Sequence, residues 1–219
     1  MGEGVKGRRY DNTRRQAQTR ATKAAVITAA QDLFVQRGYP AATIDAIAEA
    51  ASVPVATVYR LFGSKRGILS AVLDVAFGGD DQPIAFHERP AVRAALADPD
   101  PGRLLDAFSH LARELLDRSA SIQHVLVSAA TVDPEAADLL ATARSQRLLG
   151  QSRVIQALAD RRALREGLTV AQGADIFYTL VSPEVHRILT IERRWTPSAY
   201  EIWLTATLRA TFLAIPPDA

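Results

Sequence analysis

The amino-acid sequence predicts an all-α protein of about nine helices, in which a small helical domain precedes a larger one. The first observation is that apolar residues recur every three or four positions through most of the 219 residues, which is the spacing of one helix face. The second is that no segment alternates convincingly between apolar and polar residues, as a strand would. The third is that proline, glycine and capping residues divide the chain into segments of helical length.

The chain begins with a polar and basic segment over residues 1–18. This segment has no apolar period, so we expect a flexible arm there. Apolar residues that include Val26 and Phe34 then predict a first helix from about Thr19 to Gly38, where the glycine favours a stop.

Two short helices follow, each with a recognisable start. Thr43 is a candidate N-cap for a helix over residues 44–51. Pro54 suits the start of a second helix over residues 55–62, because a proline in the first turn gives up an N–H group that has no helical partner anyway. The turn between these helices has about three residues.

The rest of the chain contains longer helical patterns. Asp133 followed by Pro134 is a strong helix start, and Thr169 with Gln172 fits a capping box. We expect Pro183 to kink the helix that contains it. The apolar periods predict helices over residues 64–77, 104–118, 122–131, 133–162, 169–193 and 196–215.

The expected organisation is therefore an arm over residues 1–18, one domain over residues 19–66 and another over residues 67–219. Charge is unevenly distributed along it. Residues 1–66 carry 11 Lys or Arg against five Asp or Glu, a net charge of +6, whereas the whole chain carries +2. A basic front on a mildly acidic body indicates an anionic partner for the front. The alternative is a solvated basic tail.

The two short helices, with the long helix before them, form a helix-turn-helix pattern. Such a motif inserts its second helix into the major groove of double-stranded DNA, and therefore needs small or hydrogen-bond-donating side chains on the exposed face. Val55, Ala56, Thr57 and Arg60 meet that need, and Tyr59 and Lys65 are placed to donate to phosphates. The alternative is that Tyr59 is a packing aromatic and Arg60 a solvated charge.

At these residues the chain resembles the TetR family of transcriptional repressors. The resemblance rests on residues 23–34, 43–48 and 53–62, together with Gly38-Tyr39, Ser64-Lys65 and Leu69. It implies DNA-backbone contacts by Thr43, Thr57, Tyr59 and Lys65, and base contacts by Val55, Ala56 and Arg60. Of these, Arg60 is the one able to bind guanine through two hydrogen bonds, so we expect it to carry sequence specificity.

The sequence departs from the family pattern at two positions. Ser52 stands where the family usually has glycine, which should strain the tight turn. Pro54 stands where the family usually has Ser or Thr, which removes a hydroxyl group that could touch phosphate. The resemblance further implies a homodimer on a palindromic operator and an unknown small-molecule effector that releases it.

The last two predicted helices are apolar around most of their circumference. A helix of this kind is buried on two sides, and the second side can be a partner subunit. The alternative is a central helix inside one monomer. We expect a dimer interface that includes Ile188, Tyr200, Trp203, Leu204, Leu208 and Phe212.

Four residues of the larger domain are candidates for lining a ligand cavity: Phe108, Leu111, Phe177 and Tyr178. They predict an apolar or aromatic effector with few polar contacts. The alternative is that all four are core residues.

Other chemistry finds little support. The chain has no cysteine, which excludes disulfides, thiolate metal sites and a thiol nucleophile. His residues lack metal-ligand spacing, and we interpret Asp106, His110 and Arg113 as a solvated helix face. We therefore expect no metal, no cofactor and no enzyme activity.

No apolar run is long enough to span a membrane, so a cytoplasmic protein is expected. The rival function is a helical small-molecule-binding or catalytic protein that no longer engages DNA.

Overall fold

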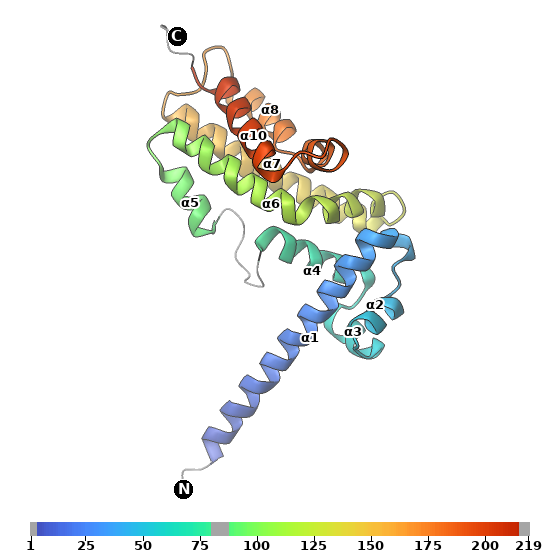
Figure 1. The fold of residues 1–219 in the computed structure, drawn as a ribbon. Coiled ribbons are helices and arrows are strands. Elements are labelled where there is room, and N and C mark those ends of the chain that lie inside the picture. Colours follow the sequence, from blue (N-terminus) through green and yellow to red (C-terminus); the bar gives the residue numbers. More distant parts are fainter. Residues whose placement is uncertain (1–3, 80–87, 215–219) are drawn as a thin grey trace. The chain divides into compact units, whose positions relative to one another are not determined.

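The computed structural model describes residues 4–79 and 88–214, with side chains from residue 14 onward. The all-α prediction is confirmed: apart from an isolated β-bridge between Leu164 and Leu213, the regular structure of these residues is helical (Figure 1). The chain divides into two compact units, Met1–Val72 and Leu73–Ala219. The predicted boundary between residues 66 and 67 and the division between the two units both fall within one helix, α4 (Lys65–Gly78), which continues from one unit into the other.

The first unit is built from the helices expected for a helix-turn-helix. It contains α1 (Gly4–Ala41), α2 (Ile44–Ala50), α3 (Val55–Phe62) and the first part of α4. Apolar side chains from all four helices meet in its core, where the fully buried residues include Val26, Phe34, Ile47, Val58 and Ile68. The bounds predicted for α3 are confirmed to the residue.

Helix α1 is longer than the sequence suggested. It begins at Gly4, so residues 4–18, for which a flexible arm without a helical period was expected, are helical in the structure. Residues 8–37 contain neither proline nor glycine and include many Arg, Gln and Ala residues, whose helix propensity extends a helix without support from a core. Gly38, the predicted stop, leaves the helical region with a φ of 76° and kinks α1, which continues beyond this break to Ala41.

The second unit consists of several packed helices with one π-helical segment. Its elements are α5 (Pro90–Ala97), α6 (Pro101–Ala129), α7 (Pro134–Asp160), α8 (Val170–Leu180), α9 (Pro183–Arg187), η2 (Ile188–Glu192) and α10 (Pro197–Phe212). Proline stands in the first turn of five of these helices, four of which begin after a capping side chain: Asp100, Asp133, Ser182 and Thr196. The predicted capping box of Thr169 and Gln172 is present.

Three expectations for this unit need correction. Helix α5 was not predicted, the two helices expected over residues 104–118 and 122–131 are one continuous α6, and the helix expected over residues 169–193 ends at Leu180. Within α6, the polar Ser119 is buried and its hydroxyl donates to the carbonyl oxygen of Leu115, which removes the reason for a break. Pro183 does not merely kink its helix, because it starts a new one.

The core of the second unit lies where α6, α7, α8 and α10 pack together (Figure 1). Its largest fully buried side chains include Tyr200, Phe177, Phe212, Leu104 and Ile155. Helices α7 and α8 approach closely, since a side chain at Gly173 would collide with Ile155. Among the described helices, none is both long enough and apolar enough to cross a membrane.

Candidate nucleic-acid interface and ligand pocket

Helix α3 presents one face to the core and the other to solvent. Val58 is fully buried and fixes the inner face. On the outer face Ala56, Tyr59 and Arg60 are exposed, with Tyr59 at 51%. Within the described part of the chain the Arg60 guanidinium has no hydrogen-bond or ion-pair partner. A guanidinium in this setting keeps all its donors available to an external acceptor.

The remaining residues predicted for DNA contact flank this face. Val55 and Thr57 are half-buried in the first turn of α3, and Thr43 is exposed at the start of α2. The Thr43 hydroxyl oxygen accepts a hydrogen bond from the backbone N–H of Ala46 at 3.1 Å, which confirms Thr43 as an N-cap. Its own O–H hydrogen is not used by that bond.

Lys65 has a structural role that the sequence did not suggest. Its ammonium group donates to the backbone oxygens of Tyr39 at 2.8 Å and Pro40 at 3.3 Å. It also lies 4.4 Å from the centroid of the Tyr39 ring, which packs against Phe34. Lys65 therefore braces the C-terminal end of α1, beyond the kink at Gly38, and a phosphate contact would have to coexist with these bonds.

The turn before α3 carries the strain that the sequence predicted. Ser52 has a φ of 54°, in the left-handed region that favours glycine. Backbone bonds hold it there, from the N–H of Ser52 to the oxygen of Glu49 and from Val53 to Ala48. At Pro54 no side chain caps α3.

Two glycines after α3 have distinct roles. Gly63 ends the helix with a φ of 73° and donates to the backbone oxygen of Tyr59. Gly67 lies in the first turn of α4, where a Cβ atom would collide with the carbonyl oxygen of Phe62. Nothing in the sequence pattern marks Gly67, because the collision depends on how two helices meet.

The four residues proposed to line a ligand cavity are not among those that line the pocket described below. Phe108 and Phe177 are buried in the core, and half-buried Leu111 packs against it, as the core alternative describes. Tyr178 is half-buried elsewhere on α8, with the Arg147 guanidinium 3.7 Å from its ring centroid.

A pocket of about 270 Å³ opens in the second unit between the end of α4, α6, α7 and α9. No sequence pattern indicates this pocket, because its walls come from segments far apart in the chain. Its apolar lining is Phe77, Ala120, Leu126, Val127, Leu140, Ala143 and Pro183. Its polar lining is Gln123, His124, Arg144, Arg147, Glu184 and Arg187.

Most residues proposed for a dimer interface lie inside the protomer. Tyr200, Leu204, Leu208 and Phe212 are fully buried, so their assignment to a surface was wrong. The alternative of a helix central to one monomer describes this face of α10. Half-buried Trp203 contacts the Trp195 and Tyr200 rings, and Ile188 is 43% exposed.

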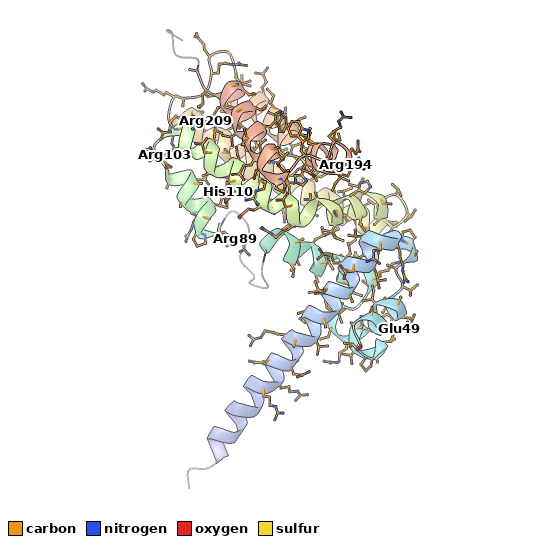
Figure 2. All side chains as sticks on the ribbon, viewed as in Figure 1. Glu49, Arg89, Arg103, His110, Arg194 and Arg209 are labelled. Carbon is orange, nitrogen blue, oxygen red and sulfur yellow. The ribbon has the colours of Figure 1, made fainter. Side chains whose placement is uncertain are left out.

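The polar faces of α6 and α10 pair with each other. Figure 2 labels two of the residues involved, His110 and Arg209. The Arg209 guanidinium binds the Asp106 carboxylate at 2.6 and 2.7 Å, and Glu201 binds both His110 at 3.0 Å and Arg113 at 2.9 Å. The interpretation of Asp106, His110 and Arg113 as a merely solvated face therefore needs correction. No three His, Asp or Glu residues of the described chain are grouped as a metal site would require.

Comparisons with known proteins agree with this architecture. Residues 26–72 match a family model described as bacterial regulatory proteins, tetR family. Over 170 residues the chain is 28% identical to the uncharacterized HTH-type transcriptional regulator YdeS of Bacillus subtilis (strain 168), which covers 77% of this chain and 78% of YdeS.

Among the solved structures that share the fold are the following two. NalD from Pseudomonas aeruginosa, described as the secondary repressor of the MexAB-OprM multidrug efflux pump, matches with a TM-score of 0.68 at 19% identity, over 92% of this chain and all of that one (100%). A transcriptional regulator from Saccharomonospora viridis, in complex with choline, matches with a TM-score of 0.66 at 19% identity, over 87% and 97% of the two chains. These relatives are named as regulators of transcription, not as enzymes.

Proposed function

Because the chain belongs to the tetR family of bacterial regulatory proteins and is thus a DNA-binding transcriptional regulator, we propose that it represses transcription. It does so as a homodimer bound to a palindromic operator, from which a small ligand releases it. Since bacterial DNA lies in the cytoplasm, the protein acts there. The observation that carries the proposal is the outer face of α3, where Arg60 and Tyr59 point away from a helix anchored by Val58.

The DNA contacts divide into two groups. Thr43, Thr57, Tyr59 and Lys65 hold phosphates, which contributes affinity for any sequence. Val55, Ala56 and Arg60 face the bases, and Arg60 selects guanine through two parallel hydrogen bonds. The name of NalD, a repressor, supports repression rather than activation.

The dimer forms through apolar side chains that the protomer leaves exposed near its C-terminal end. Ile191 and Ile202 are 65% and 72% exposed, and Ile188 and Trp195 are 43% and 37% exposed. Exposed apolar groups gathered on one part of a protein favour an interface with another subunit. A two-fold dimer then places two copies of α3 on two half-sites, which is why the operator is a palindrome.

The ligand acts from the pocket of the second unit. Phe77, in the last part of α4, lines that pocket, and α4 begins at Lys65, directly after the end of α3. A ligand that displaces α4 changes the position of α3, and a coupling of about 1–3 kcal/mol is enough for a useful switch. The choline bound to the Saccharomonospora viridis regulator supports a ligand-responsive function.

The test begins with genomic DNA from the source bacterium. Fragments retained by the protein are sequenced, and the shared motif is titrated in a mobility-shift assay. Arg60→Ala should cost about 1–3 kcal/mol at one base pair of each half-site and relax the preference there. The control is Arg153→Ala, which removes an exposed arginine from α7. If no fragment is enriched, the rival function, a helical protein that binds small molecules without DNA, replaces this one.

A further inference from the structure

The charged side chains that line the pocket of the second unit are mostly cationic. Three arginines, Arg144, Arg147 and Arg187, face a single carboxylate, Glu184. An excess of guanidinium groups around a concave site favours an anionic occupant, because arginine presents paired donors that match a carboxylate. This inference rests on the proposed ligand response and concerns the chemistry of the ligand.

Arg147 is the most buried of these arginines, and its charge is only weakly compensated. Its side chain is only 21% exposed, and its nearest carboxylate oxygen, on Glu184, is 3.9 Å away, which is beyond hydrogen-bond distance. Its Nε atom is buried without a hydrogen-bond partner among the described residues. The Tyr178 ring holds the guanidinium from one side. A guanidinium group that is partly removed from water is stabilised by a carboxylate, which supplies both the opposite charge and hydrogen-bond acceptors.

The two other arginines differ in whether their guanidinium groups already have a partner. Arg187 already pairs with the Glu192 carboxylate at 2.8 Å. Arg144 is exposed, and within the described residues its guanidinium has no ion-pair or hydrogen-bond partner. Arg144 and Arg147 are three positions apart on α7, so their side chains lie on the same face of the helix.

Apart from Gln123 and His124, the remainder of the lining is apolar. Phe77 from α4, Leu126 from α6 and Leu140 from α7 contribute side chains to it. Since the pocket holds about 270 Å³, near the lower end for ligand sites, the occupant is small. It has one polar end and an apolar body.

We propose that this pocket binds a small amphipathic carboxylate, whose charged group pairs with Arg147 and Arg144 while its hydrocarbon body contacts Phe77, Leu126 and Leu140. This replaces the expectation of an effector with few polar contacts. It also gives each half of the ligand a distinct partner in the protein.

Three probes of equal chain length separate charge from hydrophobicity: octanoate, 1-octanol and octylammonium. Binding to the full-length protein without DNA is measured by isothermal titration calorimetry at neutral pH. Octanoate should bind at least tenfold more tightly than octanol, and octylammonium should bind most weakly. Failure of octanoate to bind at millimolar concentration, or equal binding of octanol, overturns the proposal.

Two arginine variants locate the contact. Arg147→Gln and Arg144→Gln should each weaken octanoate binding, by tenfold or more for Arg147→Gln, and leave octanol binding unchanged. Arg153→Gln, on the same helix but outside the pocket lining, is the matched control. If Arg147→Gln does not fold, octanoate binding by Arg144→Gln, a substitution at an exposed residue, still tests the contact. Unchanged octanoate affinity in Arg144→Gln overturns the assignment.

A separate assay distinguishes this inference from the proposed function. Octanoate is added to the protein–operator complex in the mobility-shift assay. Charge-dependent binding without release of DNA upholds the carboxylate site and contradicts the ligand-controlled repression. Release of DNA by octanol and octanoate alike upholds the repression and contradicts the carboxylate site.

Discussion

Lys65 combines two roles that a substitution can separate. The structure shows its ammonium group bonded to the backbone at the C-terminal end of α1, and the family resemblance predicts a phosphate contact. Lys65→Ala should therefore lower the free energy of unfolding by about 1–2 kcal/mol without DNA, because two charge-assisted hydrogen bonds are lost. It should also weaken binding to all DNA sequences similarly and flatten the salt dependence of the binding constant.

Urea denaturation measures the first effect and titrations at several salt concentrations the second. A variant with parental stability would show that the bonds to Tyr39 and Pro40 contribute nothing net. A variant with an unchanged salt slope would show that Lys65 makes no phosphate contact.

Ser52 offers a test of backbone strain in the turn before α3. For a residue with a side chain, the left-handed region costs about 1–2 kcal/mol of folding free energy. Glycine avoids this cost, but roughly half of the gain is offset because glycine makes the unfolded chain more flexible. Ser52→Gly should thus raise the free energy of unfolding by about 0.5–1 kcal/mol. Its neighbour Ala51, with a φ of −80°, supplies the control, because Ala51→Gly should destabilise. Equal effects of the two glycines in urea denaturation would contradict the strain argument.

The contact between α6 and α10 depends on pH through Glu201. Burial alone would raise the pKa of this carboxyl group, but hydrogen bonds from Arg113 and His110 outweigh burial, so its pKa is lowered from the ordinary value of 4.5. A carboxyl group with a lowered pKa in the folded state stabilises the fold above pH 4.5. That contribution is lost as the pH falls through the lower, folded-state pKa.

Glu201→Gln should therefore be less stable than the parent protein at neutral pH, and the difference should disappear in acid. Thermal unfolding followed by circular dichroism between neutral pH and pH of about 3 measures it. Glu166→Gln, at an exposed residue without an ion pair in the described chain, should show no such difference. A gap between parent and Glu201→Gln that persists in acid would exclude linkage through this carboxyl group.

At the scale of helices, the sequence predicted the bounds of a helix best where a proline, a glycine or a capping residue stands at its end. Pro54 and Gly63 bracket α3, and Thr196 with Pro197 starts α10, so these ends could be located from sequence. Helix α6 could not, because the burial that tolerates Ser119 arises from packing against other helices.

The same distinction applies to the candidate sites. The outward residues of α3 could be predicted, since a short amphipathic helix has one buried side. In α10 the apolar residues occupy most of the circumference, and periodicity does not say which of them face the protomer's own core. The pairing of its polar stripe with Asp106 and Arg113 of α6 decides that question, and this pairing exists only in three dimensions.

At the scale of the whole molecule, the corrected interface changes the experiment that tests the dimer. Trp203 packs against Tyr200 and Trp195, so a charge there would disturb the protomer itself. Ile202 is 72% exposed, and Ile202→Glu should leave the fold intact. It should convert the dimer into monomers and abolish operator binding, because one half-site supplies too few contacts.

Multi-angle light scattering measures the mass, and circular dichroism checks the fold. Val132→Glu is a suitable control, since Val132 is 65% exposed in the turn after α6 and is not one of the residues of the proposed surface. A parent protein that is monomeric at micromolar concentration would remove the basis for a palindromic operator.

The missing side chain at Gly67 has a genetic consequence. Any other amino acid there would direct a carbon atom at the carbonyl oxygen that ends α3, so the junction between α3 and α4 tolerates a single residue type. In a library of random codons selected for a working regulator, position 67 would remain uniform even though it touches no DNA. Positions 56 and 60, which are exposed, would instead vary together with the operator used for selection. Positions that stay invariant in such a selection would therefore identify the junction that holds α3 in place. Positions that vary with the operator would identify the face of α3 that contacts the bases.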